Sequence, residues 1–388
     1  MLEVEATMDT PITGASRVGT LGHQLDCRLA RLLATLGQGE HARHALRVAR
    51  VLSQDWRDEA ISSGPRWPSD ITDDHSPFEF SLAMTGRSES LRILTEPQGR
   101  RRFSLSASWA RAADIHEEIA RRWSVDLAGY HQIAELFAPA PTATGLFSIW
   151  HSAILGKTRN TQFKVYLNPA IHGVDNAVAI VTEAFDRLGL GQAWTQLSAQ
   201  VLRRGKLDQL LYFSLDLSDK AEARAKVYVA HREASAEDVS RATEGCPGFE
   251  THATSRWFQH VLGGSGPFRE RPPITCFALA RGTLDLHTTT LHLPIRCYAR
   301  DDFEVARRVC ALLSFPQRVR YMRALTEFAE RPLESGPGLQ TYVSLRPSPG
   351  RQAVTVYMAP QVYSNTSKRE RQACGAPAAC TPLFELAS

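Results

Sequence analysis

The amino-acid sequence predicts an α+β fold: a ten-stranded antiparallel β-barrel surrounded by helices and built from five repeats of two helices and two strands. Three observations lead to this prediction. Five pairs of strand-like segments recur at intervals of roughly 65 residues. Helical stretches separate successive pairs. One pattern, Lys-Val-Tyr, stands at 164–166 and again at 226–228 although the chain has only six lysines, which indicates a repeated structural unit.

Each strand pair is a predicted hairpin, because two runs of alternating apolar and polar residues flank a short polar turn. The predicted pairs are 77–84 with 91–96, 146–155 with 161–167, 210–217 with 223–229, 274–280 with 288–298, and 340–346 with 353–358. Apolar residues at helical spacing predict helices in 21–56, broken near 37–39, and in 107–123, 174–188, 236–263 and 303–328. Asp301 and Asp302 are expected to cap the last of these helices.

Ten antiparallel strands in one strongly twisted sheet favour closure into a barrel, because closure pairs the two edge strands with each other. The helices between hairpins must then cover the apolar outer face of the barrel. Polar residues accumulate on the opposite face of these strands. That inner face is expected to line a solvent-filled lumen wide enough to hold a ligand.

The composition is that of a soluble globular protein, with 43% hydrophobic and 22% charged residues in a chain of 388. We expect a flexible N-terminus over 1–20, a single barrel domain over 21–364 and a disordered tail over 365–388. The sequence shows no apolar run of membrane-span length and no signal-peptide pattern, so we expect a cytoplasmic protein with no membrane partner. A net charge of +4 and the lack of a nucleic-acid motif argue against nucleic acid as a partner.

The seven cysteines form no Cys-x-x-Cys pair, which predicts free thiols and no structural zinc. The sequence also lacks the glycine-rich phosphate loops and the His-Glu-x-x-His zinc motif. The acidic pairs at 73–74 and 301–302 are isolated, unlike the Asp-Asp-x-x-Asp motif that carries magnesium-bound diphosphate in many terpenoid enzymes. Any diphosphate is therefore expected to be held by protein cations, with a metal dispensable.

The second strand of every hairpin carries a cationic or hydroxylated residue on the predicted inner face. These residues are Arg92, Lys164, Tyr166, Arg224, Lys226, Tyr228, His292, Arg296 and Tyr357. Any one of them alone is typical of a solvated strand face. If the barrel closes, however, the cations converge in one lumen, where they repel one another unless an anion is present. Arginine forks, lysine charges and tyrosine hydroxyls together suit a phosphate or diphosphate.

Two further residues on first strands are candidates for chemistry. Glu79 lies between Phe78 and Phe80, which point the opposite way, so its carboxylate is expected to face the lumen and accept a hydrogen bond from a ligand N–H. A salt bridge to an arginine such as Arg92 is an equally good interpretation of the spacing. His151 is a candidate general base because its pKa lies near working pH, the alternative being an ordinary hydrogen-bonded histidine.

The order and spacing of several segments resemble the indole prenyltransferases of the dimethylallyltryptophan synthase type, whose fold is a ten-stranded barrel ringed by helices, the ABBA or PT barrel. The resemblance spans residues 56–363. Its most specific segments are 77–81, 91–97, 164–166, 224–228, 293–298 and 342–344.

The resemblance implies a role for each matching residue. Glu79 would hold the indole N–H of the acceptor. The cations around a prenyl diphosphate would be Arg92, Lys164, Arg224 and Lys226, and the tyrosines shielding an allyl cation would be Tyr166, Tyr228 and Tyr357. Two positions depart from the family. The fungal enzymes have a lysine proposed as base where the nearest match here is His151, and a tyrosine is expected near His292.

The leading hypothesis is therefore an enzyme that transfers a dimethylallyl group from dimethylallyl diphosphate, its co-substrate, to an indole carbon of L-tryptophan, with no other cofactor and no essential magnesium. Alternative acceptors are a tryptophan-containing cyclic dipeptide, an indole alkaloid or tyrosine. A rival of another class is a non-catalytic barrel that binds an anionic small ligand, and RNA binding is a weaker third. A monomer or homodimer is expected.

Overall fold

The computed structural model describes residues 19–61, 64–86, 88–99, 103–123, 125–155, 161–220, 223–280, 286–347 and 352–363. The predicted disordered tail at 365–388 and nearly all of the predicted flexible N-terminus lie outside these residues. Gly19 and Thr20 are described, and Thr20 is the N-cap of the first helix, where its side chain accepts a hydrogen bond from the backbone N–H of His23.

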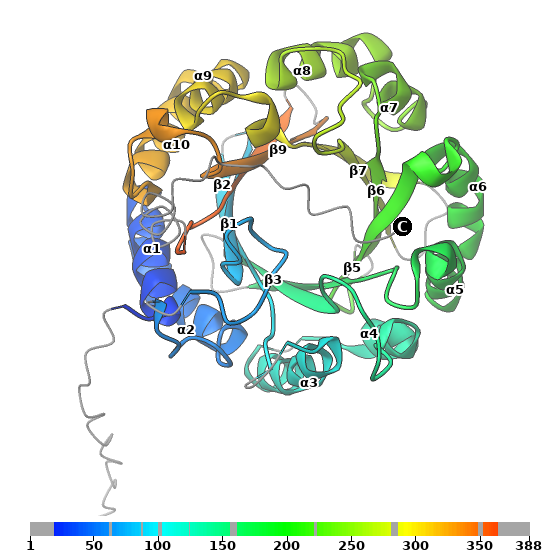
Figure 1. Cartoon of the computed structure of the whole chain (residues 1–388), viewed down its shortest axis with the longest axis horizontal. Coiled ribbons are helices and arrows are strands. Elements are labelled where there is room, and N and C mark those ends of the chain that lie inside the picture. Colours follow the sequence, from blue (N-terminus) through cyan, green and yellow to red (C-terminus); the bar gives the residue numbers. More distant parts are fainter. Residues whose placement is uncertain are drawn as a thin grey trace, which may run out of the picture.

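Ten antiparallel strands form a closed barrel in which each strand pairs with its neighbours in sequence, and the first strand pairs with the last. The helices form a ring around it (Figure 1). The strands are β1 (Phe78–Thr85), β2 (Ser88–Thr95), β3 (Ile149–Leu155), β4 (Gln162–Leu167), β5 (Asp208–Asp216), β6 (Arg224–His231), β7 (Ile274–Ala280), β8 (Leu286–Leu293), β9 (Gln340–Arg346) and β10 (Ala353–Met358). The predicted fold class is confirmed.

Two helices precede each hairpin, which gives the predicted five ααββ repeats. The helices are α1 (Leu21–Thr35), α2 (Ala42–Leu52), α3 (Leu105–Arg122), α4 (Ala128–Ile133), α5 (Ala177–Arg187), α6 (Gly191–Val201), α7 (Ala236–Ala242), α8 (Thr251–Leu262), α9 (Asp302–Leu312) and α10 (Phe315–Phe328). The break between α1 and α2 was predicted. The sequence did not predict α4 and α6, both of which begin without a side-chain cap.

Local capping explains where several helices begin. Asp301 caps α9, as predicted, by accepting a hydrogen bond from the backbone N–H of Glu304 at 2.7 Å. Ser314 and Gln317 form a capping box at the start of α10, which is why one predicted helix over 303–328 is two. Asp302 is almost fully buried and accepts hydrogen bonds from the backbone N–H groups of Leu339 and Gln340. The N-terminal end of α9 is thereby tied to the start of β9.

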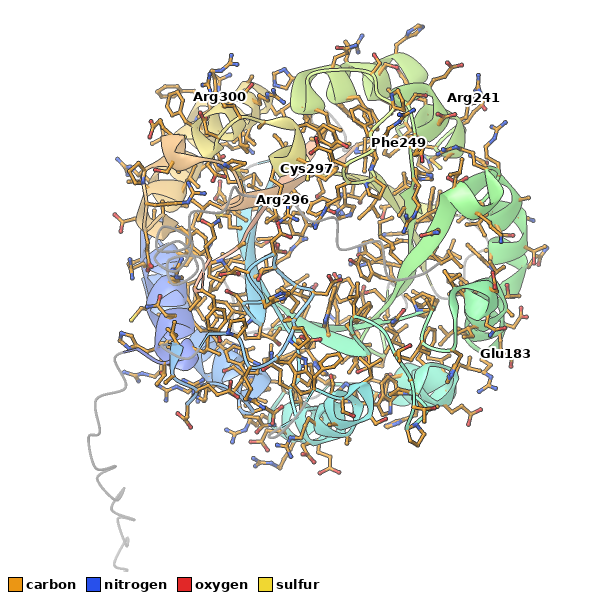
Figure 2. All side chains as sticks on the ribbon, viewed as in Figure 1. Glu183, Arg241, Phe249, Arg296, Cys297 and Arg300 are labelled. Atoms are coloured by element: carbon orange, nitrogen blue, oxygen red, sulfur yellow. The ribbon has the colours of Figure 1, made fainter. Side chains whose placement is uncertain are left out.

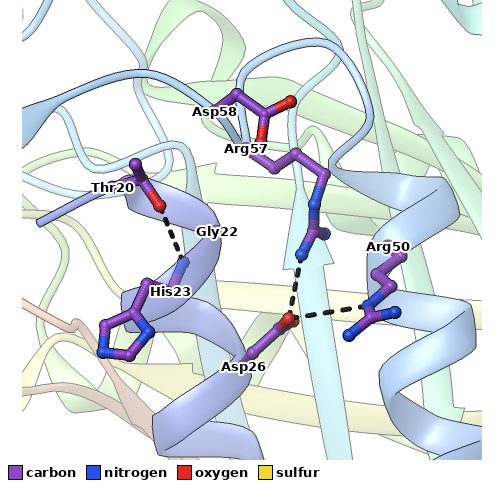
Figure 3. Close-up of a pocket in the computed structure, with 7 residues that line it drawn as sticks. All are labelled: Thr20, Gly22, His23, Asp26, Arg50, Arg57 and Asp58. Atoms are coloured by element: carbon purple, nitrogen blue, oxygen red, sulfur yellow. Dashed lines mark hydrogen bonds and ion pairs between the residues drawn. The ribbon is translucent and has the colours of Figure 1, made fainter. Parts of the chain in front are cut away.

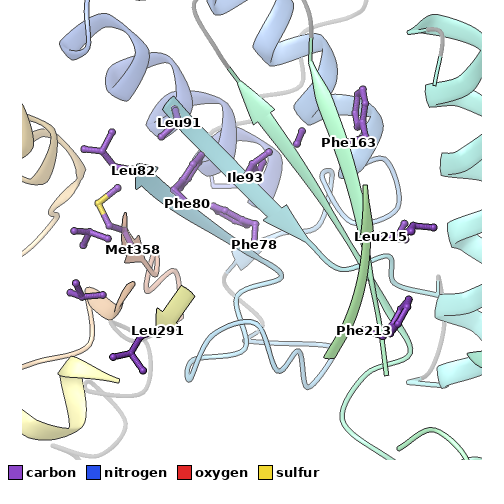
Figure 4. Packing of buried hydrophobic residues seen from close by; sticks show 14 of the residues in the cluster. Phe78, Phe80, Leu82, Leu91, Ile93, Phe163, Phe213, Leu215, Leu291 and Met358 are labelled. Atoms are coloured by element: carbon purple, nitrogen blue, oxygen red, sulfur yellow. The ribbon is translucent and has the colours of Figure 1, made fainter. Parts of the chain in front are cut away.

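The main hydrophobic core lies between the barrel and the helices. Alternate residues of every strand point outwards into it, as Figure 4 shows for Phe78, Phe80 and Leu82 of β1. Phe80 packs edge-on against Phe328 of α10 with ring centroids 5.7 Å apart. Each such fully buried side chain stabilises the fold by about 1.5–3 kcal/mol. Because side chains alternate along a strand, this apolar packing forces the intervening residues into the lumen.

Two predicted strands were too long. The strand predicted over 146–155 begins only at Ile149 in β3, and the second strand of the fourth hairpin ends early. The prediction ran to Tyr298, whereas β8 ends at Leu293 and residues Ile295–Tyr298 form the 3₁₀ helix η6. Pro294 has no backbone N–H to give to the sheet, so the ladder cannot continue through it. The expectation that Arg296 shares a strand face with His292 is therefore wrong.

His151 of β3 points outwards, away from the lumen. It lies in register with Thr95 and Val165, on the same face as Ala153. Its Nε2 lies 2.9 Å from Nε2 of His116 on α3, and both side chains are buried. Burial, followed by the nearby His131, lowers the pKa of His116 to about 3, and burial together with His116 lowers the pKa of His151 well below its usual range. Both imidazoles are thus neutral at pH 7.

This buried pair makes stability acid-sensitive. The folded-state pKa values lie below the ordinary value near 6.5, so the unfolded chain takes up protons first as pH falls, and the free energy of unfolding drops below about pH 6.5. Each histidine contributes up to about 1.4 kcal/mol per pH unit. Between pH 7 and pH 5 the two histidines together lower the free energy of unfolding. We expect His116→Gln to roughly halve this part of the decrease, as measured by urea denaturation at each pH. The exposed His172→Gln is the control, and equal pH slopes for both variants would contradict the prediction.

Candidate active site

The inner faces of the strands enclose a cavity in the half of the lumen near the hairpin turns. Its lining residues are Thr85, Arg92, Ser152, Ile154, Lys164, Tyr166, Arg224, Lys226, Tyr228, Cys276, Ala278, Thr288, Thr290, His292, Ser344, Arg346, Ala353, Thr355 and Tyr357. Eight of the eleven predicted site residues are in this set. Glu79 lies deeper along the lumen, and His151 and Arg296 lie elsewhere.

A second cavity lies outside the barrel, between α1, α2 and the segment that follows α2 (Figure 3). Three of its charged residues pair with one another, since Asp26 accepts a hydrogen bond from Arg57 at 2.9 Å and contacts Arg50 at 3.6 Å. These ion pairs tie the helices together. The lumen, where cations gather around open space, is the better candidate for chemistry.

Four predicted cations, Arg92, Lys164, Arg224 and Lys226, meet in the lumen cavity. Strand pairing explains their approach: Lys164 of β4 lies opposite Asp216 of β5, and Lys226 of β6 lies opposite Ser214, the next inward residue of β5. The two lysine side chains are only 8% and 9% exposed, so water screens their charges weakly. A fifth cation, Arg346 of β9, lines the same cavity and was not predicted.

Asp216 is the unpredicted carboxylate among these cations. Its Oδ1 contacts Nζ of Lys164 at 2.7 Å and Nζ of Lys226 at 3.3 Å, and its Oδ2 accepts from Nε of Arg224 at 2.9 Å. Burial alone would raise the pKa of Asp216, but Lys226, Lys164 and Arg224 outweigh burial and hold it well below the usual range. The alternation in 210–217 puts Asp216 on the same face as Ser214 and Tyr212, so inspection of first strands as well as second strands would have found it.

Tyrosines form a belt of aromatic rings in the lumen, next to the cations on the side away from the hairpin turns. Ring centroids of Tyr166 and Tyr228 lie 5.8 Å apart, and Tyr212, which was not predicted, lies 5.7 Å from Tyr228. His292 continues the belt, 5.6 Å from Tyr228 and 5.7 Å from Tyr357. Burial, then Arg92 and Lys226, lowers the pKa of His292 to about 3. His292 therefore enters the site as a neutral aromatic ring, near the position where the family resemblance implies a tyrosine.

The opposite half of the lumen carries carboxyl groups. Glu79 is 7% exposed and accepts a hydrogen bond from Oγ1 of Thr341 at 2.9 Å. Burial raises the pKa of Glu79 to about 8, although Thr341 and Arg271 oppose the rise. The predicted alternative, a salt bridge between Glu79 and Arg92, does not form: on β1 the residue opposite Arg92 is Ser81.

Two more acidic residues and an apolar wall adjoin Glu79. Burial raises the pKa of Glu96 to about 8, and Glu96 accepts a hydrogen bond from Nε1 of Trp150 at 3.4 Å. Burial likewise raises the pKa of Asp70 to about 6, with Arg271 opposing the rise. Trp150 stacks on Phe147 with centroids 4.1 Å apart. This end of the lumen thus offers a flat apolar surface beside hydrogen-bonding carboxyl groups, which suits an aromatic ring with polar substituents.

The remaining predicted residues lie away from the cavity. Arg296 on η6 pairs with Asp73, which also accepts from Arg271 at 3.1 Å. Figure 2 shows Arg296 closer to the barrel than Arg300, Arg241 and Glu183, which lie on the outer rim. His151 faces α3. The structure therefore brings neither residue to the cations, and it does not place His151 in the lumen, where the prediction of a general base requires it.

Among the described residues, no three His, Cys, Asp or Glu side chains gather as metal ligands would, and no helix is both long and apolar enough to cross a membrane. The five described cysteines are free thiols, as predicted, and Cys374 and Cys380 lie outside the described residues. Cys276 lines the lumen cavity.

Comparison with known proteins identifies the fold and the family. The profile of tryptophan dimethylallyltransferases matches residues 49–244. The 6-dimethylallyltryptophan synthase of Micromonospora olivasterospora, solved with DMASPP and Trp, is 32% identical, covers 89% of this chain and 98% of its own, and superposes with a TM-score of 0.83. This chain belongs to the tryptophan dimethylallyltransferase family.

Further members of the family are also similar. The 5-dimethylallyltryptophan synthase of Streptomyces coelicolor is 28% identical over 89% of this chain and 99% of its own, with a TM-score of 0.80. Prenyltransferase PriB, solved with L-tryptophan and dimethylallyl thiolodiphosphate, is 29% identical over 89% of this chain and 97% of its own, with a TM-score of 0.79. The predicted family and its ABBA barrel are confirmed.

The buried Glu79 carboxyl should cost stability at alkaline pH. Its folded-state pKa of about 8 lies above the ordinary 4.5, so stability present at low pH is lost as pH rises through 8. At each pH the unfolding free energy of Glu79→Gln is compared with that of wild type. We expect this difference to shift in favour of the variant by at least about 2 kcal/mol between pH 6 and pH 9. Guanidinium denaturation measures this gain, with the exposed Glu117→Gln as control. No gain beyond that of the control would show that Glu79 ionises normally.

Proposed function

We propose that the protein transfers a dimethylallyl group from dimethylallyl diphosphate to an indole carbon of L-tryptophan. The observation that carries the proposal is the division of the lumen: a cationic half and a carboxyl-bearing half, separated by a belt of aromatic rings. The relatives solved with tryptophan and a dimethylallyl diphosphate analogue support the choice of both substrates.

The cations are proposed to hold the diphosphate. Arg92, Lys164, Arg224, Lys226 and Arg346 would stabilise the negative charge that grows on the leaving group as the bond between the allylic carbon and oxygen breaks. These five cations, of which the two lysines are buried, would supply the charge that magnesium provides in other diphosphate enzymes, so we propose that turnover requires no metal. His292 would face the allyl group as a neutral ring.

The tyrosines are proposed to protect the allyl cation. Tyr166, Tyr228 and Tyr357, joined by Tyr212, would exclude water and present their ring faces to the positive charge. An indole carbon attacks the cation, and the resulting arenium ion loses the proton from that carbon to restore aromaticity. The inward residues of β3 are Trp150, Ser152 and Ile154, so we propose that the base that accepts this proton lies on another element.

The acceptor is proposed to be a free amino acid held at the carboxyl-bearing end. Glu79 would accept the indole N–H, and Trp150 would pack against the ring. Arg271 reaches this end, because it interacts with Tyr342 and Asp70, and its guanidinium matches an α-carboxylate. A cyclic dipeptide has neither a free carboxylate nor a free ammonium group. Arg271 would meet the carboxylate of a free amino acid, and Asp70 would meet its ammonium group. These two residues therefore favour tryptophan over a cyclic dipeptide.

Purified protein incubated with dimethylallyl diphosphate, L-tryptophan and EDTA should yield dimethylallyltryptophan, detected by mass spectrometry. Lys164→Ala and Lys226→Ala should each lower kcat/KM for the diphosphate on the order of 100-fold, because each removes a donor to the leaving group. The exposed Lys220→Ala is the control. Absence of product with tryptophan and with a panel of indoles and phenols would refute the proposed prenyl transfer. The non-catalytic barrel that binds an anionic small ligand would then be the better hypothesis.

Arg271→Gln should change acceptor preference. We expect kcat/KM for L-tryptophan to fall roughly 10–100-fold, because a charge-assisted hydrogen bond is lost, while tryptamine, which lacks the carboxylate, loses less than about threefold. Competition between the two acceptors, followed by chromatography, gives the ratio directly. Arg269→Gln is the matched control, since Arg269 is 74% exposed. Parallel losses for both acceptors would remove Arg271 from acceptor recognition.

A cytoplasmic location and a monomeric or homodimeric state stay predictions.

A further inference from the structure

Asp216 occupies an unexpected position for a carboxylate. A carboxylate repels the diphosphate that the site is proposed to bind, yet Asp216 contacts three of the five lumen cations directly. Its backbone is fixed by strand pairing, since Asp216 lies opposite Lys164 across β4 and β5. The backbone N–H of Arg224 also donates to Oδ2 at 3.3 Å. The carboxylate is thus held from both neighbouring strands.

The contacts leave most of the cations' donors available. Each lysine directs its ammonium nitrogen at the same oxygen, Oδ1, and an ammonium group has two more N–H donors. Arg224 gives Asp216 its Nε, which leaves the terminal fork of the guanidinium for another acceptor. A carboxylate that competed with the diphosphate would be expected to take the fork. Asp216 therefore leaves the guanidinium fork of Arg224 and two N–H donors on each lysine for another acceptor.

The two lysines also need a counter-charge. Because both contact one oxygen, at 2.7 and 3.3 Å, their nitrogens lie within about 6 Å of each other, a distance at which like charges oppose protonation. Burial and then Lys226 lower the pKa of Lys164 well below its usual range, and Asp216 counteracts both. The other titratable or charged groups around the cluster are Arg92, Tyr166, Tyr228, Cys276, His287, His292, Arg346 and Tyr357. None of these is a carboxylate.

We propose that Asp216 is a positioning residue for the prenyl donor: it holds Lys164, Lys226 and Arg224 in place and supplies a counter-charge between them, so that their remaining donors meet the diphosphate. This inference rests on the proposed function for the identity of the donor. Binding of inorganic diphosphate tests it without prenyl transfer.

Asp216→Asn keeps the shape of the side chain and removes its charge. We expect calorimetric titration with inorganic diphosphate to show an affinity loss of at least tenfold at pH 8.5 and less than threefold at pH 6.5, because losing the counter-charge disfavours the protonated form of Lys164, and does so more as pH rises. In turnover, the alkaline limb of the kcat profile should move down by at least one pH unit, with KM for tryptophan unchanged. Asp219→Asn, in the exposed turn after β5, is the matched control.

Rescue separates a charge effect from a folding defect. Arginine keeps its proton without a counter-ion, so Lys164→Arg in the Asp216→Asn background should restore most of the affinity at pH 8.5. Asp216→Glu retains the charge, so the alkaline limb of its kcat profile should lie at the same pH as in wild type. This variant tests the inference if Asp216→Asn does not fold. Unchanged or tighter diphosphate binding by folded Asp216→Asn would overturn the inference. An alkaline limb of Asp216→Glu that lies as far from the wild-type position as that expected for Asp216→Asn would also overturn it. Diphosphate binding that depends on Asp216 in a protein that prenylates nothing would refute only the proposed function.

Discussion

Closure of the barrel, through pairing of β1 with β10, is the constraint on which the rest of the structure depends. Five residue pairs from Phe80 with Met358 to Met84 with Val354 complete the ring. Once closed, the sheet has no edge, and every strand must send alternate side chains into one of two environments. The outer environment is an apolar layer against the helices. The inner one is a lumen in which residues distant in sequence are brought within a few ångströms.

The lumen is polarised along the barrel axis. Cations and Asp216 lie towards the hairpin turns, whereas Glu79, Glu96 and Asp70 lie towards the connections to the helices. The buried carboxyl groups have raised pKa values and the buried Lys164 a lowered one, because burial disfavours the charged form of each. An anionic donor and an acceptor with an N–H group therefore have distinct preferred ends, and the aromatic belt lies where the two would meet.

Most of the fold could be predicted from the sequence because a hairpin is a local structure with a two-residue period. β9 and β10 were predicted to the residue, and the inward residues of β4 and β6 followed from alternation alone. The errors arose where local pattern gives no information. Proline ended β8 before Arg296, and the side of β3 on which His151 lies depends on which of its residues the helices cover. Asp216 and Arg346 lie on the first strands of their hairpins, whereas the repeated cationic pattern that predicted the site lies on the second strands. Arg271 lies in a loop whose position only the tertiary fold defines.

The pairing of the first strand with the last also limits how the site comes into being. Tyr357 stands on β10, so a nascent chain cannot complete the lumen until the last strand has left the ribosome. Before that moment β1 and β9 are both open edges with exposed backbone hydrogen-bonding groups, and such edges are templates for aggregation. The outer helices, which can form and cover each hairpin as it appears, are then as important for the solubility of the unfinished chain as for the stability of the finished one.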